Sequence, residues 1–202
     1  SKLRGSVEFL PVSVDDRPTI TKRRYVEPAF LTKMFEVQFL DDRPLSEHAE
    51  RKVEAILEAQ LDRHDVVIVA DFGHGLLTDR LRDLLCASQK FLAVNTQTNS
   101  ANLGFNPVTK YHRADYVCLH EGELKLALRA QYDDIRLLAT RLREELKTSH
   151  LMVTRGPNGS LMLSGDESIH EAPALSVRAV DRTGAGDAVF AQQHFGGFQA
   201  FS

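Results

Sequence analysis

The chain has 202 residues, of which 43% are hydrophobic and 26% are charged, and its formal net charge at pH 7 is −3. This composition is typical of a globular protein, and the slightly acidic balance offers no electrostatic attraction to nucleic acid or to an anionic membrane. No run of about 18 apolar residues predicts a membrane-spanning helix, and the first residues do not resemble a signal peptide. We therefore expect neither a nucleic-acid partner nor a membrane partner.

The cysteines and histidines indicate a protein of a reducing compartment that has no structural zinc. Cys86 and Cys118 lie far apart in apolar segments, so buried free thiols are expected, with a disulfide as the alternative. The eight histidines show no ligand spacing such as His-x-x-x-His. These features predict a cytoplasmic protein.

The first forty residues predict one irregular segment and one pair of strands. Residues 1–18 are interpreted as a strand or a loop that ends in a turn. Polar and apolar side chains alternate on both sides of a short break within residues 19–40, which predicts two antiparallel strands. Lys22, Arg23 and Arg24 form a small basic cluster. This cluster is either a solvated strand edge, where lysine blocks further pairing, or a direct substrate contact.

The middle of the chain alternates between strands and helices. The predicted strands are short apolar runs, and the predicted helices carry apolar residues at helical spacing, the first of them capped by Ser46. This order predicts an α/β fold, with a parallel sheet that has helices on both faces. Strands are expected at 65–70, 91–94, 115–119, 151–154, 160–163 and 168–171, and helices at 46–61, 79–88, 121–130 and 134–147.

Polar residues follow the predicted strands at the places where a parallel sheet binds its ligands. Such ligands lie outside the carboxyl ends of the strands. The residues at these ends are therefore candidates for a binding site, and they are Asp71, Asn95, His120, Thr154 and the Gly184–Asp187 turn.

The stretch from residue 180 to residue 190 is the centre of the candidate site. Gly184 and Gly186 permit a tight backbone turn that side chains would block, and a helix start is predicted at 185–191. A turn that leads into a helix presents backbone N–H groups at the positive end of the helix dipole, which predicts an anion site. Asp187 lies in the first turn, where it either stabilises the helix start or acts as a base toward the bound group.

The run Asp181-Arg182-Thr183-Gly184-Ala185-Gly186-Asp187 resembles the signature Asp-x-Thr-Gly-Ala-Gly-Asp of the ribokinase-like (PfkB) carbohydrate kinases. Other family segments are matched in the same order, and the resemblance covers about residues 17–195. Two of them resemble the heptose-7-phosphate kinase branch, which is the kinase half of bifunctional ADP-heptose synthases. The matches are the lid of that branch (19–24), its Asp-Tyr-Gly-Lys-Gly segment (69–75), the segment with Asn-x-x-Glu (115–123) and the nucleotide-binding strand end (153–156 with Gly159).

The resemblance implies a fold and an activity. The fold would be a three-layer ribokinase-like α/β fold with a mainly parallel central sheet and a small antiparallel lid at about 17–40, in a single but partial domain over 1–202. The activity would be an ATP-dependent kinase that transfers the γ-phosphoryl group to a hydroxyl of a sugar or sugar phosphate, of the heptose-phosphate kind. The implied cofactors are ATP and Mg²⁺, with K⁺ as in several relatives, and a homodimer through the lid strands is compatible with the family.

The resemblance also implies a role for each matched residue. Asp187 would take the proton from the sugar hydroxyl, while the N–H groups of Gly184, Ala185 and Gly186 would hold the oxygens of the phosphoryl group. The other implied roles are a cofactor or nucleotide contact for His120, Glu123, Thr154, Gly156 and Gly159, a Mg²⁺ contact through water for Glu123, a K⁺ contact for Asp181 and Thr183, and a substrate contact for Asp71, Asn95 and Lys22.

The sequence departs from the family pattern at two residues and at both ends. His120 stands where the family has Asn, and it either fills that role or only caps the helix that begins near Glu121. His74 stands where the heptose branch has Lys. The opening strand of the family would precede residue 1 and its adenine-covering helices would follow the Asp187 helix, so we expect a part of a longer kinase that is not competent alone. The alternative is a non-catalytic kinase-like module that binds nucleotide or a protein partner.

Overall fold

The computed structural model describes residues 7–15, 17–29, 32–166, 168–174, 184 and 186–191, and all structural statements below concern these residues. Residues 7–15 form no strand, so the loop interpretation of this segment is the one the structure supports. The elements expected between residues 19 and 172 are all present. No helix in the described part of the chain is long and apolar enough to cross a membrane.

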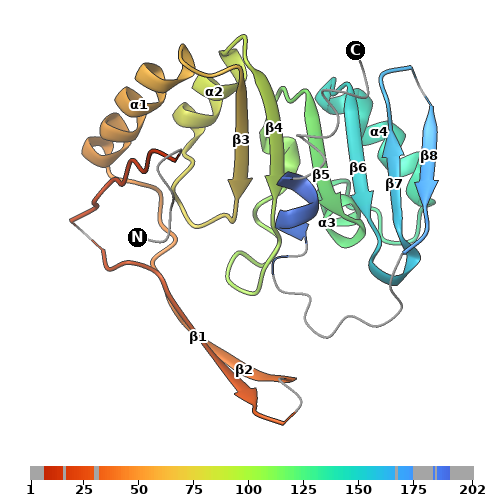
Figure 1. The fold of residues 1–202 in the computed structure, drawn as a ribbon, viewed down its shortest axis with the longest axis horizontal. Helices are drawn as coiled ribbons and strands as arrows, with labels where there is room; N and C mark the ends of the chain where they lie inside the picture. Colours follow the sequence, from red (N-terminus) through yellow and green to blue (C-terminus); the bar gives the residue numbers. More distant parts are fainter. Residues whose placement is uncertain are drawn as a thin grey trace.

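A six-stranded sheet is the centre of the structure, in the order β3-β4-β5-β6-β7-β8 (Figure 1). The first four strands are parallel and the last two pairings are antiparallel, which confirms the mainly parallel sheet. The carboxyl ends of the four parallel strands therefore meet at one edge. The strands are β3 (Val66–Asp71), β4 (Phe91–Thr96), β5 (Tyr116–His120), β6 (His150–Thr154), β7 (Ser160–Leu163) and β8 (Ile169–Ala172).

Four helices accompany the sheet, and their starts follow the capping signals of the sequence. They are α1 (Glu47–Leu61), α2 (Asp79–Ala87), α3 (Glu121–Ala127) and α4 (Ile135–Leu146). Ser46 caps α1 as predicted, because its hydroxyl accepts a hydrogen bond from the Ala49 N–H at 3.4 Å. The helix expected at 121–130 ends earlier. The left-handed backbone of Arg129, with φ +53°, is incompatible with a continuing helix.

All four helices pack on the same face of the sheet, and their apolar residues share one core with the strands. Helical structure lies on both faces of the sheet, as predicted, but unequally: among the described residues the second face carries one short helical segment, residues 186–191 (Figure 1). The strand order explains this arrangement. Strands β3 to β6 follow one another across the sheet without a reversal, and right-handed crossovers in one direction place all connecting helices on one side.

The second face of the sheet has a small core of its own. Phe190, which is 3% exposed, packs there with Ala93, Tyr116, Cys118 and Met152. Burial raises the pKa of the Cys118 thiol to about 11. Both cysteines are free and buried, as the sequence predicts.

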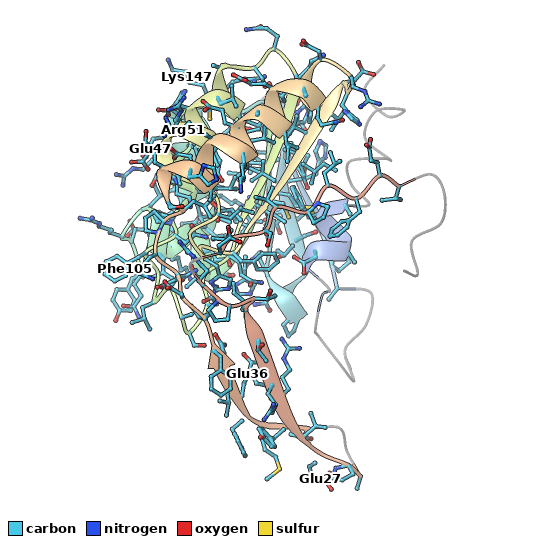
Figure 2. The ribbon with its side chains drawn as sticks, turned by 90° about the vertical axis from the view of Figure 1, so that its left-hand side faces the viewer. Glu27, Glu36, Glu47, Arg51, Phe105 and Lys147 are labelled. Atoms are coloured by element: carbon cyan, nitrogen blue, oxygen red, sulfur yellow. The ribbon has the colours of Figure 1, made fainter. Side chains whose placement is uncertain are left out.

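Strands β1 (Thr21–Glu27) and β2 (Thr32–Phe39) form a separate two-stranded antiparallel sheet, as predicted for the lid. The hairpin extends away from the main sheet beyond the carboxyl end of β3 (Figure 1). Figure 2 shows Glu27 at the far tip of the hairpin and Glu36 midway along it. One face of the hairpin is apolar, because Tyr25 and Phe35 stack with ring centroids 4.4 Å apart while both remain exposed.

Candidate active site

The structure brings the predicted strand-end residues to one edge of the sheet. Asn95 lies opposite Ala70, and His120 lies opposite Thr154, in the register of neighbouring parallel strands. The Asn95 amide donates a hydrogen bond to the Cys118 carbonyl at 2.7 Å. The strand-end side chains thus link neighbouring strands as well as facing the edge where ligands bind.

The helical segment that carries Asp187 begins at this sheet. Gly184 has φ +76°, a left-handed backbone that favours glycine, and its carbonyl accepts the first helical hydrogen bond, from Ala188 N at 2.9 Å. Asp187 is exposed, and among the described residues no atom outside the adjoining chain lies within 4 Å of the position that a Cβ atom would take on Gly184 or Gly186. Within the described part of the chain, Gly184 and Gly186 therefore face open space. Ala185, Asp181 and Thr183 lie outside the described residues.

His120 caps helix α3. Its Nδ1 accepts a hydrogen bond from Gly122 N at 3.1 Å, and Glu123 completes a capping box by accepting from His120 N at 2.8 Å. The structure thus shows that His120 has the capping role. Because Nδ1 is the acceptor, the neutral ring carries its proton on Nε2, and this nitrogen remains a donor for a ligand.

Glu123 also joins the start of α3 to the loop that follows β4. Its second carboxylate oxygen accepts a hydrogen bond from Thr98 N at 2.9 Å. Burial raises the pKa of Glu123, although its two backbone hydrogen bonds act in the opposite direction. Each oxygen keeps a further lone pair, so the carboxylate fits a Mg²⁺ contact through water. The described residues hold no cluster of three or more acidic, histidine or cysteine side chains that could bind a metal directly.

The turn after β6 contains Gly156 and Gly159, two of the residues predicted to line a nucleotide. Gly159 has φ +80°, and a Cβ atom there would lie 2.0 Å from the Ala172 carbonyl oxygen, so the close approach of β8 requires glycine. Gly156 has φ +56° but faces open space. The Thr154 hydroxyl donates to the Leu119 carbonyl at 3.4 Å, which links β6 to β5 at the same edge.

Asp71 is 6% exposed, and its carboxylate has several protein partners. It accepts from Gly73 N at 2.9 Å and from the Tyr111 hydroxyl at 2.7 Å, and it forms an ion pair with Lys110 at 2.6 Å. These contacts tie the Asp71 carboxylate to the turn that follows β3 and to the loop that contains Lys110 and Tyr111. Sequence reasoning missed Lys110 and Tyr111, because both belong to a long loop whose polar composition carries no sign of a buried partner.

Lys22 lies at the base of the hairpin, where its ammonium is 3.1 Å from the Nε2 of His74. The other cations of this hairpin face are paired, since Arg24 and Lys33 both contact Glu36, at 2.6 and 3.3 Å. Hydrogen bonding to Arg24 is the main reason that the pKa of Glu36 falls to about 2. A cavity of about 480 Å³ opens at Asp71 beside the start of α2.

A second cavity, of about 560 Å³, separates the hairpin from the body of the molecule. Its hairpin side is strand β2 and its body side is the loop after β4. It therefore lies between the lid and the carboxyl edge of the sheet. The residues that line it are Lys33, Glu36, Gln38, Leu40, Ser100 and Ala101.

Comparison with known proteins gives matches along most of the chain. The family model described as pfkB family carbohydrate kinase matches residues 31–192. The bifunctional protein HldE of Nitrobacter hamburgensis is 31% identical over 192 residues, which are 93% of this chain and 38% of the relative. HldE of Rhodopseudomonas palustris strain TIE-1 is 32% identical over 199 residues, or 95% of this chain and 39% of the relative. The chain thus spans well under half the length of these curated relatives.

Solved structures show the same fold. The structure of phosphofructokinase-2 from Escherichia coli in complex with substrates and products matches with a TM-score of 0.62 at 19% sequence identity. The match covers 83% of this chain and 55% of the phosphofructokinase-2 chain. Ribokinase from Thermotoga maritima matches with a TM-score of 0.59 at 18% sequence identity, and the match covers 88% of this chain and 57% of the ribokinase chain. At these identities the likeness shows the ribokinase-like fold alone.

Proposed function

This chain belongs to the pfkB family of carbohydrate kinases, and from that membership we propose that it forms part of an ATP-dependent kinase acting on a hydroxyl of a sugar or sugar phosphate. The observation that carries the proposal is the exposed Asp187 just after the left-handed Gly184, on a helical segment that lies over β4 and β5 (Figure 1). For the acceptor we propose a heptose phosphate or a similar sugar phosphate. The HldE relatives at about 30% identity support this choice.

In the proposed mechanism, catalysis rests on position and electrostatics. Asp187 accepts the proton of the acceptor hydroxyl as it attacks the phosphoryl group. The backbone N–H groups of Gly184, Ala185 and Gly186 stabilise the negative charge that develops on the phosphoryl oxygens. The open space above Gly184 and Gly186 supports this role, because a phosphoryl group needs room at these N–H groups.

The proposed nucleotide site lies at the neighbouring strand ends. His120 donates from Nε2 to the nucleotide, and Thr154, Gly156 and Gly159 line it. Glu123 holds Mg²⁺ through water, as suits an ion that keeps several of its waters and binds mainly to substrate phosphates. The ion supplies positive charge that offsets the charge of the phosphates. For Asp181 and Thr183 we propose a K⁺ contact, in line with a phosphofructokinase-2 structure described as a complex with potassium.

The acceptor is proposed to lie between the lid and the carboxyl edge of the sheet. The cavity between β2 and the loop after β4 supports this position. Lys22 and Asn95 are the proposed contacts, whereas the paired carboxylate of Asp71 acts mainly through the loop it holds. We propose further that residues 1–202 belong to one kinase domain. The exposed Tyr25–Phe35 stack supports a homodimer through the lid strands.

A second candidate function has one observation in its favour. His120 and Glu123 both take part in the cap of α3, so a purely structural role for these two residues is consistent with a non-catalytic nucleotide- or protein-binding module. Under this alternative, nucleotide would bind without turnover.

A coupled assay of ADP release tests the proposed function. The complete protein is supplied with ATP, Mg²⁺ and a panel of sugars and sugar phosphates, including heptose 7-phosphates. Turnover that depends on the acceptor supports the kinase, and a preference for phosphorylated acceptors supports the finer proposal. ATP binding without ADP release on every acceptor would favour the binding module.

A further inference from the structure

Side chains of Arg17, Gln38 and Lys22 make contacts that fix the base of the lid hairpin. The Arg17 guanidinium donates to the carbonyl oxygens of Arg43 and Pro44, at 2.5 and 2.8 Å, and so ties the entry of the hairpin to its exit. Gln38 on β2 contacts the Ser100 hydroxyl at 3.4 Å. Lys22 on β1 contacts His74 at 3.1 Å. Because the hairpin extends away from the sheet (Figures 1 and 2), such contacts decide where it lies.

His74 is held in place by the loop around it. Its neighbour Gly75 has φ +78°, and a Cβ atom there would lie 2.1 Å from the Arg43 carbonyl oxygen. The Gly75 carbonyl also accepts a hydrogen bond from Leu45 N at 3.2 Å. The His74 ring lies nearly parallel to that of Phe72, with centroids 6.4 Å apart. The loop after β3 is thus packed against the exit of the hairpin, and the imidazole has little freedom to move away from Lys22.

The contact between Lys22 and His74 requires a neutral imidazole. An ammonium group can only donate, so Nε2 of His74 must accept and the ring proton must lie on Nδ1. A protonated imidazole has no lone pair, and it would place two positive charges within hydrogen-bond distance. Within the described residues, Nδ1 is buried and has no hydrogen-bond partner that could offset such a charge.

The charges that face His74 come from three elements. Lys22 lies on β1, Asp42 lies in the segment after β2, and Asp71 lies at the end of β3. Burial is the main cause that lowers the pKa of His74, and Lys22 lowers it further, while the two carboxylates act in the opposite direction. Asp71 is already paired with Lys110 at 2.6 Å, which weakens its effect on the imidazole.

We propose that His74 is a positioning residue which, as a neutral imidazole, holds Lys22 and the base of the lid against the loop after β3, and which releases them on protonation. The hairpin is then fixed at neutral pH and loosens as the pH falls below the ordinary titration range of histidine. Release also withdraws Lys22, which is a proposed substrate contact. Hydrogen exchange of the hairpin amides reports on the lid without any turnover, so its outcome is independent of the proposed kinase activity.

Hydrogen exchange of the hairpin amides tests the proposal. Exchange of β1 and β2 is measured at about pH 7.5 and about pH 5, corrected for the intrinsic pH dependence of exchange. In the wild-type protein we expect exchange to be about three- to tenfold faster at the lower pH, as suits the loss of one hydrogen bond at an exposed position. His74→Gln keeps an acceptor for Lys22 but does not titrate, so its hairpin should stay protected at both pH values. His74→Phe should exchange fast at both.

A matched control and a second variant keep the test decisive. His112→Phe replaces an exposed histidine that pairs with Asp83, away from the hairpin, and it should behave as the wild type. Lys22→Met removes the donor at an exposed position, so it tests the contact even where a change at His74 impairs folding. It should give fast exchange at both pH values and raise the pKa of His74 seen by NMR. Wild-type pH dependence in His74→Gln, or unchanged protection in Lys22→Met, would overturn the proposal.

Discussion

Phe190 stacks on Tyr116 with ring centroids 6.0 Å apart and the two planes 16° from parallel. This contact joins the short helical segment of Asp187 to the first residue of β5. Because the segment has only six described residues, it cannot be stable through its own hydrogen bonds and depends on such packing. The position of Asp187 on this face of the sheet therefore depends on an aromatic contact made three residues further along the chain.

The first prediction concerns this contact. We expect Phe190→Ala to lower the free energy of unfolding by about 3–5 kcal/mol, as for other buried phenylalanines, because the helical segment unfolds together with the sheet on which it packs. Turnover should fall with it, although Asp187 itself is unchanged. Phe105→Ala is the control, since Phe105 is 88% exposed and projects from the surface in Figure 2, and it should change stability by less than about 0.5 kcal/mol. Urea unfolding of both variants decides the matter. Equal effects would show that Phe190 does not hold the segment.

The second prediction compares two glycines of the turn after β6. Gly159→Ala places a Cβ atom against the Ala172 carbonyl oxygen and strains a left-handed backbone, so it should destabilise the protein by more than about 2 kcal/mol. The Cβ atom of Gly156→Ala would meet no neighbour, so this variant should lose only ~1 kcal/mol of stability, which is the cost of a left-handed backbone for alanine. Thermal unfolding measures both. A larger effect at Gly156 would contradict the packing of β8 on this turn.

The placement of strands and helices could be predicted from the sequence, because apolar runs and capping residues act locally. The unequal distribution of the helices between the two faces could not be predicted, because strand order is a long-range property. A sheet whose order reverses would have carried helices on both faces, and here the described strands run from β3 to β6 in one direction. The helix expected at 121–130 is present as α3, and only its early end was not predicted, because no residue type indicates the left-handed backbone of Arg129.

The candidate site could be predicted where its residues end strands. Asn95, His120 and Thr154 lie at the expected edge because the parallel register brings strand ends together. The partners of these residues come from distant parts of the chain. Lys110 and Tyr111 reach Asp71 from a loop, and Lys22 reaches His74 across 52 residues, so no local pattern indicates these contacts.

The third prediction concerns the cap of α3. His120→Ala removes the acceptor for Gly122 N and should cost about 0.5–2 kcal/mol of stability. His120→Asn supplies another capping side chain, and its amide is the group that the family has at this position, so stability should be nearly unchanged. If Nε2 donates to the nucleotide, His120→Ala should also weaken ATP binding more than His120→Asn does. Chemical unfolding and ATP titration of the two variants provide the comparison. An alanine variant as stable as the wild type would exclude the capping role.

The fourth prediction concerns the ion pairs of the lid. The pKa of Glu36 is about 2, mainly because Arg24 donates to its carboxylate. A lowered pKa means that the contribution of this pair is present above the ordinary value of 4.5 and is lost as the pH falls toward 2. Arg24→Met should raise the pKa of Glu36 toward 4.5, as followed by the carboxyl carbon shift in NMR. Arg23→Met changes the opposite face of the strand and should leave the titration unaltered. A shift of equal size in both variants would refute the pairing.

The substitution Asp187→Asn is the most direct test of the proposal that Asp187 is the base of a sugar kinase. Asp187→Asn is nearly isosteric and lies at an exposed position, so the fold should be preserved. Asp133→Asn, also exposed and placed before α4, is the matched control for the loss of one negative charge. ADP release is measured in the complete protein with its best acceptor. We expect a loss of about 10²–10⁴-fold in turnover for Asp187→Asn at unchanged thermal stability, and none for the control. Turnover of Asp187→Asn within twofold of the wild type would show that Asp187 is not the base.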